Sequence, residues 1–126
     1  MLAVCQEFEM EHEFVSQGIA FFFAGGLGNT GAVCGAVCGA MMAFGLKMGR
    51  PDTMGEMLPT LAVVQEFRRR FEAEMGTINC RELTGLDLST EEGIEQSMNS
   101  DVAMRVCFPA VGVAYQLVLD LLKETS

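Results

Sequence analysis

The chain has 126 residues with five cysteines, one histidine and no tryptophan, and its formal net charge is −9. This length suits a single compact domain, so we expect residues 1–126 to form one unit. The negative charge argues against nucleic acid or an anionic lipid surface as a partner, and a lone histidine excludes sites that need two. The odd number of cysteines, with no basic leader at the N-terminus, predicts a reducing, cytoplasmic location.

The first third of the chain predicts two apolar helices separated by a glycine-rich loop. Residues 1–23 have apolar positions at helical spacing, including Phe8 and Phe22. Residues 18–46 carry no charge and exceed the ~20 residues that cross a bilayer. The loop at 25–31 interrupts this stretch, and its backbone would be unsatisfied in lipid. We therefore predict two buried helices and no membrane span.

The second of these helices is expected over 31–48, with Thr30 as its cap. Gly31-Ala32-Val33-Cys34 is repeated as residues 35–38, which places glycines and cysteines in parallel rows. Each interior glycine costs a helix about 1 kcal/mol relative to alanine. Close packing of another backbone would offset that cost at Gly35, Gly39 and Gly45. We expect this Gly/Ala/Cys-rich helix to lie at the centre of an all-α bundle.

The rest of the chain also predicts helices and no strand. Asp52-Thr53 caps a helix with its main body at 61–75, where Pro59 lies in the first turn or marks a kink and Gly76 ends the helix. Asn79 caps a brief turn at 80–83 that ends before Gly85. Ser89-Thr90-Glu91-Glu92 opens a helix near 90–98. A last helix is expected over 101–124, with a kink at Pro109.

Several other features predict ordinary structural roles. Arg68–Arg70 should form a solvated helix face with neighbouring glutamates, and His12 a surface position. Methionines at 41, 42, 54 and 57 follow apolar helical patterning, which favours core packing over a soft-metal site.

The cysteines are the candidate chemical groups. Cys34 in the first turn of its helix, and Cys80 between Asn79 and Arg81, lie where a helix N-terminus or a cation lowers a thiol pKa. Cys107 lies between Arg105 and Pro109. Cys5 suits a buried core thiol, whereas Cys38 suits either a shared site with Cys34 or simple packing. None of the usual metal spacings is present, so any metal site would be assembled from distant helices.

The ordered set of these motifs resembles a known family. It comprises Cys34-Gly35-Ala36-Val37-Cys38-Gly39, residues 41–46, Phe67, Phe71, Gly76, Cys80-Arg81-Glu82-Leu83 and Cys107. This set is similar to that of the putative redox-active proteins named for the C_GCAxxG_C_C pattern. The resemblance implies that Cys34, Cys80 and Cys107 occupy family cysteine positions. It also implies a first cysteine upstream of Met1, whose context Cys5 does not match, so we expect this chain to lack it.

Three hypotheses follow. The first is thiol-based redox chemistry, with Cys34 or Cys80 as the attacking thiolate and the other, or Cys107, as the resolving thiol. The second is an iron–sulfur or zinc site on Cys34, Cys38, Cys80 and Cys107. The third is a helical assembly protein in which the thiols only pack. Under each hypothesis helix packing favours a homodimer, and the sequence does not identify a redox partner.

Overall fold

The computed structural model describes residues 2–8 and 21–125, and in these ranges the fold is all-α, as predicted. An isolated antiparallel bridge joins Val33 to Asn79, and no strand is present in the described ranges. In chain order the elements are α1 (Leu2–Glu7), α3 (Ala24–Leu27), α4 (Gly35–Met48), α5 (Met54–Met75), α6 (Cys80–Thr84), α7 (Glu91–Met98), the π-helix η1 (Ala103–Cys107) and α8 (Phe108–Thr125).

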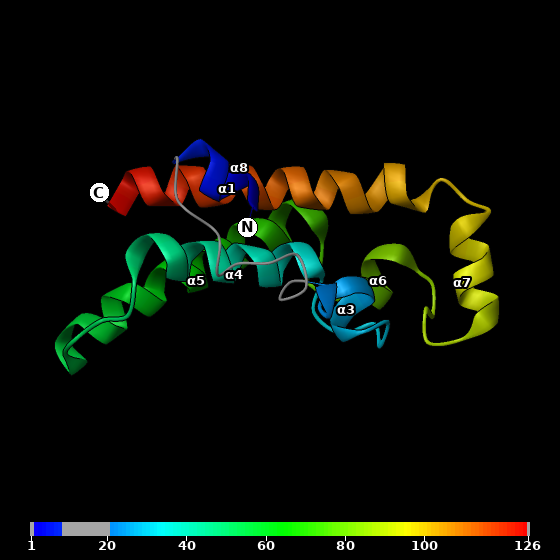
Figure 1. The fold of residues 1–126 in the computed structure, drawn as a ribbon, viewed down its shortest axis with the longest axis horizontal. Helices are drawn as coiled ribbons and strands as arrows, with labels where there is room; N and C mark the ends of the chain where they lie inside the picture. The colour runs from blue at the N-terminus through cyan, green and yellow to red at the C-terminus, as the bar shows by residue number, and fades with distance from the viewer. Residues whose placement is uncertain (1, 9–20, 126) are drawn as a thin grey trace.

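The core forms where α4 and α5 both pack along α8, the long helix at the top of Figure 1. Phe67 and Phe71 of α5 are completely buried, and the Phe44 ring of α4 meets Phe67 edge to face with 5.9 Å between the ring centroids. Facing alanines, including Ala43 and Ala110, are also buried and allow the helix backbones to approach closely. The core therefore combines a phenylalanine cluster with small side chains.

The α4 helix begins four residues later than the predicted start at Gly31. Gly31 has a left-handed φ of 75°, and the bridge at Val33 holds the next residues out of the helix. Thr30 is not the cap, because its hydroxyl donates to the carbonyls of Gly26 and Leu27 in the loop. Cys34 is the N-cap. The predicted helix over 31–48 is thus wrong at its start and right at its end.

The prediction that glycines in this helix allow another backbone to approach holds at one position and fails at another. A Cβ at Gly35 would lie 3.1 Å from the carbonyl oxygen of Phe23, just before α3, so a larger residue would require that backbone to shift by a few tenths of an ångström. At Gly45 no described atom lies within 4 Å of the same point. Close packing against another described residue therefore does not explain why position 45 is a glycine.

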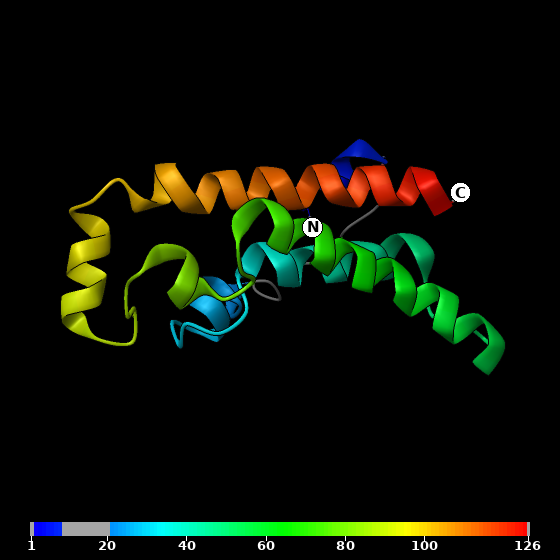
Figure 2. The same cartoon turned by 180° about the vertical axis from the view of Figure 1, so that it is seen from behind.

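The α5 helix starts at the predicted cap and is longer than its expected main body. The Thr53 hydroxyl accepts a hydrogen bond from the Glu56 N–H at 3.2 Å, and Gly76 ends the helix. The helix continues through Pro59, without a separate lead-in piece. Its N-terminal half projects beyond the other helices (Figures 1 and 2), so Met54 is 76% exposed. The assignment of Met54 to the core was wrong for this reason.

The last two helical regions follow the predicted caps more closely. Thr90 caps α7 by accepting from the Gly93 N–H at 3.0 Å. The expected 101–124 helix is irregular at its start, where η1 precedes Pro109 and the Phe108 N–H reaches back to the Ala103 carbonyl. Pro109 has no N–H to donate, which favours such a local change in hydrogen bonding.

Surface features were partly predictable. The arginine run is a solvated face whose members pair with Glu66 and Glu72, and Arg70 also reaches Glu124 on α8.

The N-terminal pattern over 1–23 is helical at α1, and the part at 9–20, which includes His12, lies outside the described residues. The charge-free stretch is divided by the loop before α4, as expected. Among the described residues one helical region, 103–125, is long and apolar enough to cross a membrane.

Candidate functional site

The candidate site lies where the loop before α4 meets the loop before α6. The Cys34 N–H donates to the Ile78 carbonyl at 2.7 Å, and the Cys80 N–H donates to the Ala32 carbonyl at 2.8 Å. The antiparallel bridge between Val33 and Asn79 lies between these two bonds. Because Cys34 and Cys80 flank one bridge, they come together although 45 residues separate them in sequence.

Two glycines make this junction possible. Gly26 is buried with a φ of 76°, and a Cβ there would lie 2.6 Å from the Ala32 backbone and 2.8 Å from the Cys80 Cβ. Gly31 has a φ of 75°, and a Cβ there would lie 2.9 Å from the Cβ of Arg81. Left-handed φ values and such close contacts both require glycine. No site role was predicted for this loop, although its closely spaced glycines were the signal that two segments meet there.

Cys34 occupies the N-cap of α4, not the first helical turn. Its backbone is extended, with a ψ of 135°, and its side chain makes no capping hydrogen bond. The residue is half-buried. The first backbone N–H groups of α4 have no carbonyl partner within the helix, and they lie next to this residue.

Cys80 is the first residue of α6 and is 9% exposed. Burial raises the pKa of its thiol, and negative charge on Cys34 and Cys107 raises it further. The prediction that Asn79 and Arg81 lower this pKa was therefore wrong. The side chain of Asn79 donates to Glu82 and that of Arg81 to Asp87, so both are engaged elsewhere.

Cys107 is the last residue of η1, which packs against α6. The residue as a whole is exposed. Partial desolvation of its sulfur nevertheless raises the pKa of the thiol, and the charge of Cys34 raises that pKa further. Met104 and Phe108, on either side of Cys107 in sequence, are also exposed. Cys107 is thus the member of the group most open to solvent.

Cys38 lies one turn into α4 and is half-buried. Burial raises the pKa of its thiol, and the charge of Cys34 raises it further. The charge of Cys34 therefore acts on Cys38, Cys80 and Cys107. The side chain of Cys5 lies outside the described residues, so its assignment to the core stays a prediction.

These four thiols are free in the structure. Among the described residues, no group of three or more histidine, cysteine, aspartate or glutamate side chains is arranged to hold a metal ion. The arrangement can support reactions between pairs of thiols, and the charge of Cys34 acts on each of the other three. The metal hypothesis stays a prediction.

The fold and site together define a helical protein with a cysteine cluster built around a helix N-terminus. A family comparison matches residues 1–121 to the family described as "Putative redox-active protein (C_GCAxxG_C_C)", and the chain belongs to that family. The match extends beyond residues 34–107, which the motifs span. Comparisons with curated proteins and with solved structures found no match.

Proposed function

We propose that the protein carries out thiol–disulfide exchange, with Cys34 as the attacking thiolate and Cys80 as the resolving thiol. The observation that supports this proposal is the pair of backbone hydrogen bonds that join the Cys34 and Cys80 segments around one bridge. Such a junction holds two thiols near each other without a disulfide. The family description agrees with a redox role.

The reaction is a two-electron exchange with a partner that carries a disulfide. The Cys34 thiolate attacks one partner sulfur, forming a mixed disulfide and releasing the other sulfur as a thiolate, which takes up a proton. The Cys80 thiol loses its proton and attacks the Cys34 sulfur, which releases the second partner thiol. The protein's dithiol becomes a disulfide, and the partner's disulfide becomes a dithiol.

The order of the two roles follows from burial. A thiol that begins exchange must reach a partner, and Cys34 is more exposed than Cys80. A raised pKa keeps the Cys80 thiol protonated at neutral pH, which suits a group that acts only after the mixed disulfide forms. Cys107 remains a second resolving candidate, because it also lies within the electrostatic influence of Cys34. We propose that this chemistry takes place in the reducing cytoplasm.

Disulfide mapping tests the proposal. The protein, kept anaerobic, is treated with oxidised glutathione, and the remaining thiols are alkylated before tryptic digestion and mass spectrometry. We expect a peptide pair joined through Cys34 and Cys80, and no internal disulfide in Cys34→Ser. Cys38→Ser is the matched control, since Cys38 lies on the same helix and should leave the pair intact.

Two results would contradict the proposal. One is an unchanged yield of internal disulfide in Cys34→Ser. The other is bound iron or zinc in stoichiometric amount, lost with Cys34→Ser, which would favour the metal hypothesis. If wild type neither forms a disulfide nor holds metal, and the cysteine variants change only stability, the thiols have a packing role.

We also propose that the chain forms a homodimer through the projecting half of α5. Its exposed residues Met54, Leu58 and Leu61 have helical i, i+4, i+7 spacing.

Light scattering tests the dimer. We expect twice the monomer mass for wild type and the monomer mass for Leu58→Glu. Met98→Glu changes an equally exposed apolar residue on α7 and should leave the dimer intact. A wild-type mass of 13.7 kDa at micromolar concentration would contradict the proposal.

A further inference from the structure

Residues 25–31, called the left-handed loop below, have an unusual backbone. Six of these residues have positive φ values between 62° and 76°: Gly25, Gly26, Leu27, Gly28, Asn29 and Gly31. Glycine adopts this conformation readily, but the Cβ of Leu27 makes it costly there. Such conformations persist only where the surrounding structure fixes them. The left-handed loop therefore depends on its neighbours for its shape.

The start of α6 supplies the contacts that hold the left-handed loop. The Cys80 N–H donates to the carbonyl of Ala32, directly after the loop, at 2.8 Å. The Arg81 N–H donates to the Gly31 carbonyl at 3.2 Å. A Cβ at Gly26 would lie 2.8 Å from the Cys80 Cβ, so the loop backbone lies directly against the Cys80 side chain. The position of Cys80 thus determines whether the loop keeps its conformation.

The same residue is one of the two proposed reactive thiols, and it lies diagonally across from the other. In the antiparallel bridge between Val33 and Asn79, Cys34 lies opposite Ile78, two residues before Cys80. Cα atoms of such diagonal neighbours are about 7–8 Å apart. Disulfide-bonded cysteines usually have Cα atoms about 4.4–6.8 Å apart. Closing a disulfide therefore requires one of the two segments to move.

The packing indicates that the Cys80 segment moves. Cys34 caps α4, a helix of 14 residues that packs along α8 in the core, whereas Cys80 begins α6, which has only five residues. Movement of Cys80 along its own segment toward Cys34 carries it away from the Ala32 carbonyl. The hydrogen bonds between α6 and the loop then lengthen, and the contact with Gly26 is lost.

We propose that the left-handed loop is a redox-sensitive switch, held by α6 while Cys34 and Cys80 are thiols and released when they form a disulfide. This inference rests on the thiol–disulfide exchange proposed above. With oxidised glutathione as the oxidant, the two thiols become one disulfide, and the glutathione disulfide is reduced to two glutathione thiols that take up the two protons. Leu27 is 46% exposed, so the change takes place at the protein surface.

Amide hydrogen exchange, followed residue by residue by NMR, tests the proposal. The protein is compared as the dithiol, kept reduced with dithiothreitol, and as the disulfide formed with oxidised glutathione and mapped by mass spectrometry. The N–H groups of Ala32, Cys80 and Arg81 should each exchange at least tenfold faster in the disulfide form, because their hydrogen bonds open. In Cys34→Ser, treatment with the oxidant should leave these rates unchanged.

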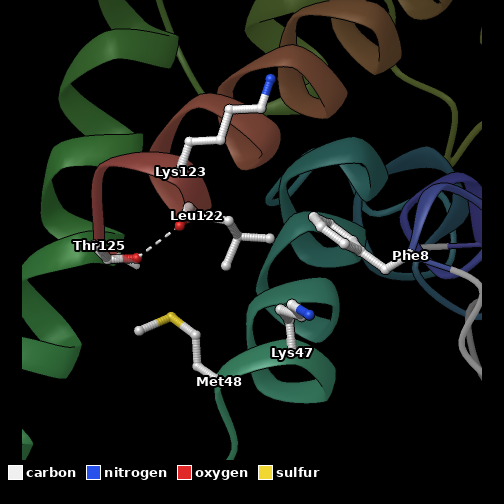
Figure 3. Close-up of a pocket in the computed structure, with 6 residues that line it drawn as sticks. All are labelled: Phe8, Lys47, Met48, Leu122, Lys123 and Thr125. Atoms are coloured by element: carbon white, nitrogen blue, oxygen red, sulfur yellow. Dashed lines mark hydrogen bonds between the residues drawn. The ribbon is translucent and has the colours of Figure 1, made fainter.

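The other end of α4 is an internal control. The helix is about 21 Å long, and Cys34 caps only its first end. The last turn lines a cleft of about 460 Å³ with residues of α8, where Leu122 is directed between Phe8 and Met48 (Figure 3). The N–H groups of Met48 and Leu122 should exchange at rates within twofold of each other in the two redox forms.

A variant with a loosened loop completes the test. The Thr30 hydroxyl donates to the carbonyls of Gly26 and Leu27 at 2.6 and 3.0 Å, and Thr30→Val removes both bonds. In the dithiol form of this variant the Ala32 N–H should exchange faster than in wild type, and oxidation should add a smaller increase. Thr60→Val is the matched control, since it removes a similar hydroxyl bond of 2.7 Å to a backbone carbonyl of α5, and it should behave as wild type.

The outcomes separate the switch from the reaction on which it rests. A mapped Cys34–Cys80 disulfide with unchanged exchange at Cys80 and Arg81 would overturn the switch and leave the exchange reaction standing. Absence of that disulfide would overturn both. Exchange that accelerates equally at Met48 would show a general loosening of the fold and would also overturn the switch, as would equal rates in the two threonine variants.

Discussion

Replacing Gly26 by alanine should destabilise the protein and disrupt the cysteine junction, because two separate costs arise at this position. The left-handed φ of 76° costs a residue with a Cβ about 1–2 kcal/mol. The new methyl group would also lie 2.6 Å from the Ala32 backbone and 2.8 Å from the Cys80 Cβ. Relieving such overpacking typically costs about 1–3 kcal/mol more.

Gly28→Ala is the matched control. Gly28 has a similar φ of 67°, but no described atom lies within 4 Å of its missing Cβ. This variant should therefore lose only the about 1–2 kcal/mol that comes from the backbone conformation. The difference between the two variants measures the contact with the Cys80 segment.

Urea unfolding followed by far-ultraviolet circular dichroism gives both free energies. Disulfide mapping of the same variants reports on the junction, and we expect Gly26→Ala alone to lower the yield of the Cys34–Cys80 disulfide. Equal destabilisation by the two substitutions, with equal disulfide yields, would refute the reasoning. The Ala32 and Cys80 segments would then not be in close contact with Gly26.

Three further predictions concern charge, thiol reactivity and the core. Hydrogen bonds from Arg69 and Arg70 lower the pKa of Glu66 from 4.5 to about 2, so its contribution to stability is present above pH 4.5 and is lost as the pH falls toward 2. Glu66→Gln should be less stable than wild type at pH 7 in urea unfolding. A difference in unfolding free energy between the two proteins that is as large at pH 2 as at pH 7 would contradict this. In timed alkylation at pH 7, exposed Cys107 should be labelled before buried Cys80. Mass spectrometry of the peptides measures the order of labelling, and the reverse order would contradict the burial of Cys80. Phe67→Ala should cost about 3–5 kcal/mol of unfolding free energy, whereas Phe21→Ala, at a residue 68% exposed, should change it by less than about 0.5 kcal/mol; similar values for the two would show that Phe67 is not a core residue.

Local signals in the sequence predicted most helix boundaries. Thr53, Thr90, Gly76 and Gly85 each lie at the helix end that their chemistry favours. These signals act through hydrogen bonds and backbone angles within one or two turns, so the sequence nearby contains the needed information. The i, i+4 spacing of Phe67 and Phe71 places them on one face of α5, and both are buried.

Long-range effects were less predictable. The pKa of Cys80 depends on burial and on charges from Cys34 and Cys107, which come from other parts of the chain. The neighbours in sequence, Asn79 and Arg81, suggested the opposite direction because a capped helix N-terminus and an adjacent cation both lower a thiol pKa. Both instead make polar contacts with nearby acidic residues, Glu82 and Asp87.

The Gly-Ala-Val-Cys repeat shows how such a long-range contact changes the meaning of a local pattern. As one continuous helix, the repeat would place Cys34 and Cys38 in a single i, i+4 row. In the structure the first copy, residues 31–34, is extended loop that pairs with residues 78–80, and the second copy is helix. Cys34 therefore lies at the junction of α4 with the Cys80 segment, and this position, more than the repeat, brings its charge to act on Cys80 and Cys107 as well as on Cys38.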